Sequence, residues 1–179
     1  MTEFEFTAVL DRVPDDDEID RLFECGLDDS TPETRDGRGV LNVHRRAASV
    51  AAAIASVVAD AGRAGFAVVG LENDDLVSLK TIALRLDRSY ESLRLIAAGR
   101  RGRGGFPSPL SGDGWSLYSW SLVEDYFARR QGPPSAIPDQ RVIAAASLLL
   151  QARALVSEPV LDELAPLVHR PDGWGELSA

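Results

Sequence analysis

Two short amphipathic segments, 79–86 and 90–98, constrain the fold of this 179-residue chain more than any other feature. Ser78 and Ser89 stand where a helix N-cap is expected. The first segment carries apolar residues at the i, i+3, i+4 and i+7 spacing of one buried stripe, namely Leu79, Ile82, Ala83 and Leu86. The second repeats such a stripe with Leu93, Ile96 and Ala97 and ends at Gly99. Because only Asp87, Arg88 and the cap residue Ser89 separate them, the sequence predicts a helix-turn-helix.

The second helix has a polar side opposite its apolar stripe. Tyr90, Glu91 and Arg94 lie there, near the N-terminal end that enters the major groove in helix-turn-helix proteins. Arg94 has the chemistry to address guanine. Glu91 could accept a hydrogen bond from a cytosine amino group or could orient an arginine, and the sequence leaves both roles open.

An arginine-rich, glycine-rich run follows these helices. Residues 100–105 read Arg-Arg-Gly-Arg-Gly-Gly, with no acidic residue nearby, which suits a loop lying against phosphates or in a minor groove. Phe106-Pro-Ser-Pro109 closes this loop, 111–114 predicts a hairpin turn, and Trp115, Leu117 and Tyr118 predict the returning strand. A helix then begins near Trp120, with Ser121 as its cap and a packing face made of Leu122, Val123, Tyr126 and Phe127.

The distribution of charge supports contact with nucleic acid although the whole chain has a formal net charge of −9. Residues 1–76 hold 7 basic and 17 acidic side chains, a net of −10, whereas 77–131 hold 9 and 5, a net of +4. Residues 132–179 hold 3 and 6, a net of −3. Positive charge is therefore concentrated in the helix-turn-helix region, where it can neutralise phosphates.

The segment 1–75 predicts a small acidic α+β domain. Alternation over 4–10 indicates a strand, 15–26 a short helix, 28–39 a loop, and 40–44 a second strand with His44 on the surface. A helix beginning near Arg46, with a stripe of Val50, Ile54, Val57, Val58 and Ala61, leads to a continuously apolar strand at 66–71, covered on both faces or set centrally. The resulting β-α-β-α-β order, a three-stranded sheet with two helices on one face, resembles a ferredoxin-like domain lacking a strand. The acidity of this domain favours either a protein partner or a scaffolding role.

The segment 132–179 predicts a helical extension. Pro133, Pro134 and Pro138 mark a linker, after which 139–156 forms a strongly apolar helix and 159–168 a shorter one. A helix apolar on more than one face must be buried, either within the chain or against a second copy. We therefore expect a homodimer, with intramolecular packing as the competing interpretation.

The succession of helix-turn-helix, glycine-containing turn, Phe-Pro-x-Pro, Trp-bearing hairpin and a helix ending in Val-x-x-x-Phe resembles the winged helix-turn-helix of the MerR/excisionase/AlpA superfamily. The resemblance covers residues 76–130, about a third of the chain. It implies a DNA-reading helix at 89–98 and a wing that includes the arginines. The chain lacks the long coiled coil and the cysteines of metal-sensing members, so metal sensing is not implied. Its wing loop is also longer and richer in arginine than the short Gly-x-Phe-Pro turn expected of the superfamily.

Other classes of function find little support. Cys25 is the single cysteine and His44 and His169 are the only histidines, so the sequence offers no zinc cluster, catalytic constellation or cofactor motif. Trp115 and Trp120 could stack on bases, but core anchoring is the more common role of such residues. No apolar run is long enough to cross a bilayer, and 1–11 lacks the pattern of a signal peptide, so a cytoplasmic protein, nucleoid-associated when bound, is expected.

The sequence thus predicts an α+β protein in three parts: an acidic domain at 1–75, a winged helix-turn-helix at 76–131 and a helical extension at 132–179. The expected function is that of a non-enzymatic, dimeric transcription regulator that binds double-stranded DNA. The alternative is an interaction adaptor, such as an antitoxin-like partner, working through the acidic domain. The residues predicted to contact DNA are Lys80, Arg88, Ser89, Tyr90, Glu91, Ser92, Arg94, Arg100, Arg101 and Arg103.

Overall fold

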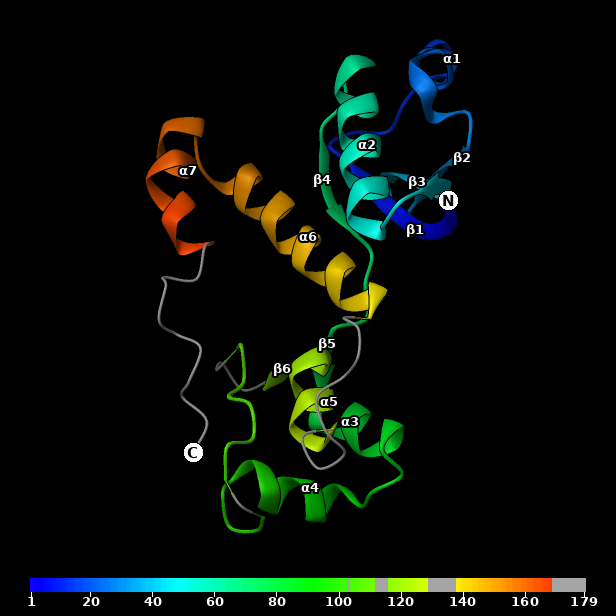
Figure 1. The fold of residues 1–179 in the computed structure, drawn as a ribbon. Helices are drawn as coiled ribbons and strands as arrows, with labels where there is room; N and C mark the ends of the chain where they lie inside the picture. Colours follow the sequence, from blue (N-terminus) through cyan, green and yellow to red (C-terminus); the bar gives the residue numbers. More distant parts are fainter. Residues whose placement is uncertain (103, 112–115, 129–137, 169–179) are drawn as a thin grey trace. The chain divides into compact units, whose positions relative to one another are not determined.

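A computed structural model describes residues 1–102, 104–111, 116–128 and 138–168. The chain divides into two compact units (Figure 1). Unit 1 comprises Met1–Leu71 and Ala146–Ala179, and unit 2 comprises Glu72–Ala145. The helix α6, Asp139–Leu155, contributes its first turns to unit 2 and the rest to unit 1. The segment 132–179, expected as a separate extension, is therefore shared between the two units.

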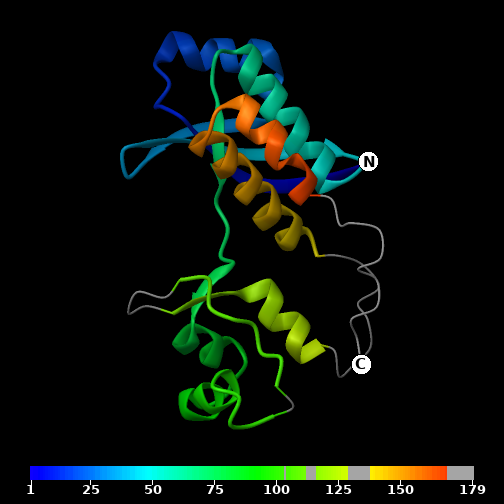
Figure 2. The same cartoon turned by 90° about the vertical axis from the view of Figure 1, so that its left-hand side faces the viewer.

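Unit 1 contains a four-stranded antiparallel sheet in the order β2-β3-β1-β4. Its strands are β1 (Thr2–Leu10), β2 (Ser30–Arg35), β3 (Arg38–Ala47) and β4 (Val68–Leu71). The helix α1 (Asp16–Leu22) with the π-helical turn η1 (Phe23–Leu27) follows β1, and α2 (Val50–Arg63) follows β3. Both helices lie on the same side of the sheet (Figure 2). The chain order is thus β-α-β-β-α-β, the order of the split β-α-β arrangement, and the sheet has one strand more than the sequence predicted.

The additional strand, β2, corrects the prediction of a loop over 28–39. It pairs with β3 through the turn Asp36-Gly37, where both residues have positive φ values of 52° and 75°. That geometry is the preferred two-residue hairpin turn, and Asp-Gly is one of its sequence signatures. β2 contains few apolar residues because it is an edge strand whose side chains are mostly exposed or half-buried.

The position of β4 also differs from the prediction of a central strand. β4 pairs only with β1, so it lies at the edge of the sheet. Ser147 of α6 covers that edge: its hydroxyl accepts a hydrogen bond from the Leu71 N–H at 3.0 Å and donates one to the Leu71 carbonyl at 2.9 Å. The apolar character of β4 therefore reflects cover by a distant helix, since an exposed apolar edge would invite pairing with other chains.

An arginine is buried in the interior of unit 1. Arg45 of β3 is 8% exposed. It donates to both oxygens of Asp29 at 2.7 Å, pairs with Asp60, and donates to the Gly26 carbonyl at 2.6 Å. The hydrogen bond from Arg45 to Asp29 outweighs the effect of burial and raises the arginine pKa. A buried charge needs such partners, so these two carboxylates are structural.

Local features of unit 1 agree with the sequence patterns. Asp15 caps α1 and forms a capping box with Glu18. His44 is exposed on β3, opposite Glu5. One residue departs from its predicted pattern, because Val58 of the predicted α2 stripe is only half-buried.

The remaining helices of this unit are α7 (Glu158–Leu164) and the 3-10 turn η2 (Ala165–Leu167). None of the helices in the described part of the chain combines the length and apolar content that a bilayer crossing requires.

Unit 2 begins with the strand β5 (Leu76–Ser78), which pairs antiparallel with β6 (Leu117–Ser119). Between these strands come α3 (Leu79–Arg85) and α4 (Tyr90–Ala97), and α5 (Trp120–Ala128) follows β6. The buried core residues come from every one of these elements: Val77, Ile82, Ala83, Leu93, Tyr118 and Val123. Trp120 and Phe127 pack against this core.

Two details of α5 correct the sequence interpretation. Leu122, expected on the packing face, is 49% exposed. Ser121, expected as the cap, instead bonds to Asp75, and Ser119 accepts the hydrogen bond from the Leu122 N–H at 3.3 Å. The predicted turn at 111–114, the Trp115 position and most of the predicted linker lie outside the described residues.

Candidate nucleic-acid interface

The turn between α3 and α4 fixes the orientation of α4. The Arg88 N–H bonds to the Ala83 carbonyl at 2.9 Å, and Asp87 adopts a left-handed conformation with φ of 49°. Ser78 and Ser89 cap the two helices through their side chains, as their positions in the sequence predict. Leu93 is completely buried in the core of unit 2. Because that residue faces inward, the opposite side of α4 faces solvent.

The solvent-facing side of α4 carries Tyr90, Glu91 and Arg94, all of them exposed. Glu91 and Arg94 form a two-pronged ion pair: Nε of the arginine donates to Oε2 at 3.0 Å, and Nη2 donates to Oε1 at 2.7 Å. The hydrogen bonds between these two side chains lower the pKa of Glu91 and raise the pKa of Arg94. Both side chains are therefore charged and mutually oriented at neutral pH.

The arginine-rich loop is attached to the C-terminal end of α4. Gly99 has a φ of 68°, which suits the residue after a helix, and the N–H groups of Arg100 and Arg101 both bond to the Leu95 carbonyl at 2.9 and 3.1 Å. The Arg101 guanidinium also donates to the Ser92 hydroxyl at 3.3 Å. This start of the loop thus lies along α4, whereas Arg103 is outside the described residues.

The other end of the loop is held by an aromatic cluster. The Phe106 ring meets the rings of Tyr118, Tyr126 and Phe127 edge-on, with centroids 5.7, 5.2 and 6.4 Å away. Near the middle of the loop, a Cβ added at Gly102 would stand 3.1 Å from the Tyr126 hydroxyl oxygen. A side chain at that position would therefore crowd α5, so the glycine permits the close approach.

The remaining predicted contact residues surround the start of α4. Lys80 of α3 and Arg88 of the turn line a shallow groove of about 280 Å³ with Leu84 and Tyr90. The Arg88 guanidinium also lies 5.0 Å from the centre of the Phe127 ring. Ser89 and Ser92 are occupied by the helix cap and by Arg101, so they support the surface through other residues.

Four cations of this surface have no acidic partner. Within the part of unit 2 that the structure describes, Lys80, Arg88, Arg100 and Arg101 form no ion pair with a carboxylate, and all four are exposed. By contrast, Arg94 and Arg141 are paired. Unpaired exposed cations along one helix pair and its following loop are the feature that an anionic polymer would match.

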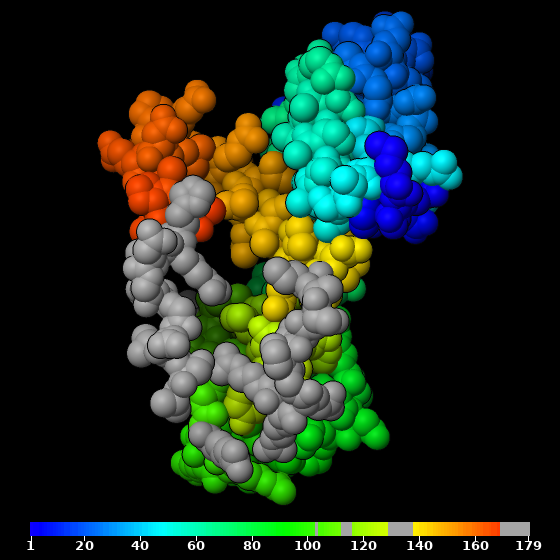
Figure 3. All heavy atoms as spheres, in the orientation of Figure 1, coloured from blue at the N-terminus to red at the C-terminus, as the bar shows by residue number. Residues whose placement is uncertain are grey.

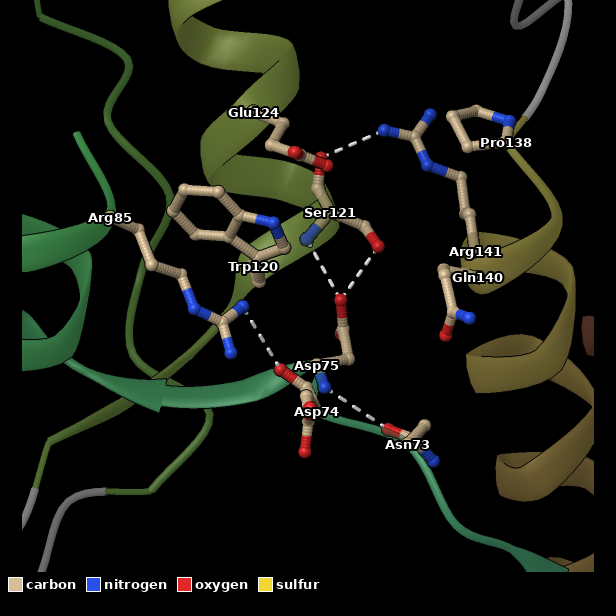
Figure 4. Close-up of a pocket in the computed structure, with 10 residues that line it drawn as sticks. All are labelled: Asn73, Asp74, Asp75, Arg85, Trp120, Ser121, Glu124, Pro138, Gln140 and Arg141. Atoms are coloured by element: carbon tan, nitrogen blue, oxygen red, sulfur yellow. Dashed lines mark hydrogen bonds between the residues drawn. The ribbon is translucent and has the colours of Figure 1, made fainter. Parts of the chain in front are cut away.

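A polar cluster elsewhere in unit 2 was not predicted from the sequence. Asp75 accepts hydrogen bonds from the Ser121 N–H and hydroxyl at 2.8 and 2.6 Å (Figure 4). Arg141 donates to the Ser121 carbonyl and to Asp125, both at 2.7 Å. Burial acts to raise the Asp75 pKa, but the hydrogen bonds from Ser121 and Ser119 and the charge of Arg141 outweigh it and lower the pKa. The cluster links the residue before β5 to α5 and to the first turn of α6. No local sequence pattern predicts it, because its members are far apart in the chain.

The same cluster borders a pocket of about 430 Å³ (Figure 4). Its walls include the Arg85 guanidinium, which lies 4.9 Å from the centre of the Trp120 ring. Trp120 is thus partly buried against the core and covered by an arginine, as expected of an anchoring residue. Among the described residues, no group of three or more His, Cys, Asp or Glu side chains is arranged to hold a metal ion.

Comparison of the chain with protein-family models, with curated proteins and with solved structures finds no match.

Proposed function

We propose that this chain is a DNA-binding protein that contacts double-stranded DNA through unit 2, in the manner of a winged helix-turn-helix of the MerR/excisionase/AlpA kind. In this proposal α4 enters a major groove and the arginine loop that begins at Arg100 contacts the phosphates beside it. A role in transcription regulation follows from sequence-selective binding of this kind.

The observation that carries the proposal is the set of exposed, unpaired cations at Lys80, Arg88, Arg100 and Arg101 beside the solvent-facing side of α4. In a chain with net charge −9, such a set forms a local positive patch, and a patch of this sign attracts an anionic partner. The hydrogen bond from the Arg101 guanidinium to the Ser92 hydroxyl joins the start of the arginine loop to α4, which supports the proposal that helix and loop form one surface.

The test is selection of DNA by the purified full chain from a pool of random duplexes, at about 50 and about 200 mM salt, followed by sequencing. We expect enrichment of a common sequence at both concentrations, with weaker retention at the higher one. Failure of the folded protein to retain duplex DNA at the lower concentration would refute the proposal.

We further propose that the protein acts as a homodimer through α6 and α7. Unit 1 exposes many large apolar side chains on these helices and on the 3-10 turn that follows them: Leu148, Leu149, Leu155, Val160, Leu164, Leu167 and Val168. Figure 3 shows the exposed surface of this helix pair in yellow to orange-red. An apolar surface of this kind is typical of an interaction site. Replacement of Leu148 and Leu149 by glutamate should convert the dimer to a monomer in light scattering.

A second candidate function is that of an interaction adaptor, in which unit 1 binds a different protein. The many exposed carboxylates of unit 1, including Asp16, Asp17 and Glu24 of α1 and η1, would then attract a basic partner. A monomeric protein that retains no DNA in the selection experiment would favour this candidate.

A further inference from the structure

The two-pronged ion pair between Glu91 and Arg94 on α4 leaves one edge of the Arg94 guanidinium available to contact a DNA base. A guanidinium has five N–H groups. Two of those of Arg94, on Nε and Nη2, are donated to Glu91, and no other hydrogen bond of Arg94 occurs in the described chain. Three N–H groups therefore remain, and they include the parallel pair on the Nη1–Nη2 edge.

The orientation of that free edge follows from the geometry of the pair. Glu91 occupies the side of the guanidinium that contains Nε, so the Nη1–Nη2 edge is the one left to meet another molecule. Two parallel N–H donors match the O6 and N7 acceptors of guanine in the major groove. Adenine presents a donor in place of O6, so it cannot accept both bonds.

The same geometry favours one of the two roles that the sequence leaves open for Glu91, that of orienting an arginine. Both of its carboxylate oxygens already accept hydrogen bonds from Arg94. Each oxygen keeps a second lone pair, so a bond from a cytosine amino group is compatible with this pairing but is not needed to explain it. A carboxylate that orients the neighbouring arginine accounts for both bonds.

We propose that Arg94 reads a guanine of the bound DNA and that Glu91 is the positioning residue that holds its free edge toward the base. The inference rests on the proposed DNA binding by unit 2. It assigns base selectivity to one residue pair, whereas Lys80, Arg88, Arg100 and Arg101 contribute affinity for any sequence.

Glu91 has opposing effects on affinity and selectivity. Its charge repels phosphates, so removing it strengthens binding to arbitrary DNA. Its hold on Arg94 favours guanine, so removing it weakens discrimination between bases. A residue that served only the stability of α4 would not produce these two opposite changes.

The experiment uses the full chain, a duplex enriched in the selection above, and the same duplex with the key guanine replaced by adenine or by 7-deazaguanine, which lacks N7. We expect the wild type to prefer guanine by about five- to 150-fold. Glu91→Gln should reduce that preference several-fold while binding to an unrelated duplex stays equal or tightens. Arg94→Ala should abolish sensitivity to 7-deazaguanine, because it removes the donor that N7 would accept from.

Glu124→Gln is the matched control, because Glu124 is an exposed carboxylate of α5 with no ion pair in the described chain. It should leave the guanine preference unchanged. If DNA binds but Glu91→Gln keeps full discrimination, or Arg94→Ala keeps sensitivity to 7-deazaguanine, the inference is overturned and the proposed function stands. If the wild type binds no duplex, both fail.

Discussion

The salt dependence of DNA binding gives a quantitative test of the arginine loop. Arg100 and Arg101 are exposed, carry no carboxylate partner in the described chain, and are fixed at the backbone by the Leu95 carbonyl. If each contacts one phosphate, the double variant Arg100→Ala/Arg101→Ala loses about 1.8 from the slope of log affinity against log salt, at about 0.9 per contact. Over a roughly fourfold rise in salt, the variant should therefore lose about tenfold less affinity than the wild type.

The assay is fluorescence anisotropy with one labelled duplex, titrated at several salt concentrations between about 50 and 200 mM. The control variant is Arg21→Ala/Arg46→Ala, which removes the same charge from exposed positions of unit 1. Its slope should equal that of the wild type, because local phosphate contacts and not net charge set the slope. Equal slopes for the wild type and both double variants would refute the role given to the loop.

Three further predictions concern the scaffold. Arg45→Met should destabilise the protein by about 3 to 5 kcal/mol in urea denaturation, because it leaves Asp29 and Asp60 without their buried partner, whereas Arg46→Met at the exposed neighbouring position should change little. A loss below about 1 kcal/mol for Arg45→Met would contradict the structural role of this network. Ser147→Ala should cost about 1 to 3 kcal/mol, because the two hydrogen bonds between the Ser147 hydroxyl and the Leu71 backbone are lost; Ser157→Ala, whose side chain makes no cap hydrogen bond, is its control, and equal effects would argue against edge cover. The lowered Asp75 pKa contributes stability that is present above the unfolded-state pKa and lost as pH falls through the lower folded-state value, so Asp75→Asn should flatten the acid limb of the stability profile; an unchanged acid limb would count against it.

The helices of unit 2 could be predicted because their signals are local. Ser78 and Ser89 cap the helices that follow them, and the stripe containing Leu93 is buried, so the exposed side of α4 followed directly from helical periodicity. The pairing of Glu91 with Arg94 also has a local signal, since residues three apart share one helix face.

The features that escaped prediction depend on distant residues. β2 contains few apolar residues because it is an edge strand, so hydrophobic alternation could not reveal it. The cover of β4 comes from Ser147, 76 positions after Leu71. Likewise, burial of Arg45 depends on Asp60, which joins it only through the packing of α2 on the sheet. Sequence periodicity contains no information about such pairings.

Hydrogen exchange with and without DNA tests most directly the claim that unit 2 is the DNA-binding surface. Using the full chain and an enriched duplex at low salt, we expect slower exchange in peptides covering α4 and the start of the arginine loop, 88–102, and unchanged exchange in the sheet of unit 1. Protection confined to unit 1, or no protection in 88–102 at saturating DNA, would contradict the account.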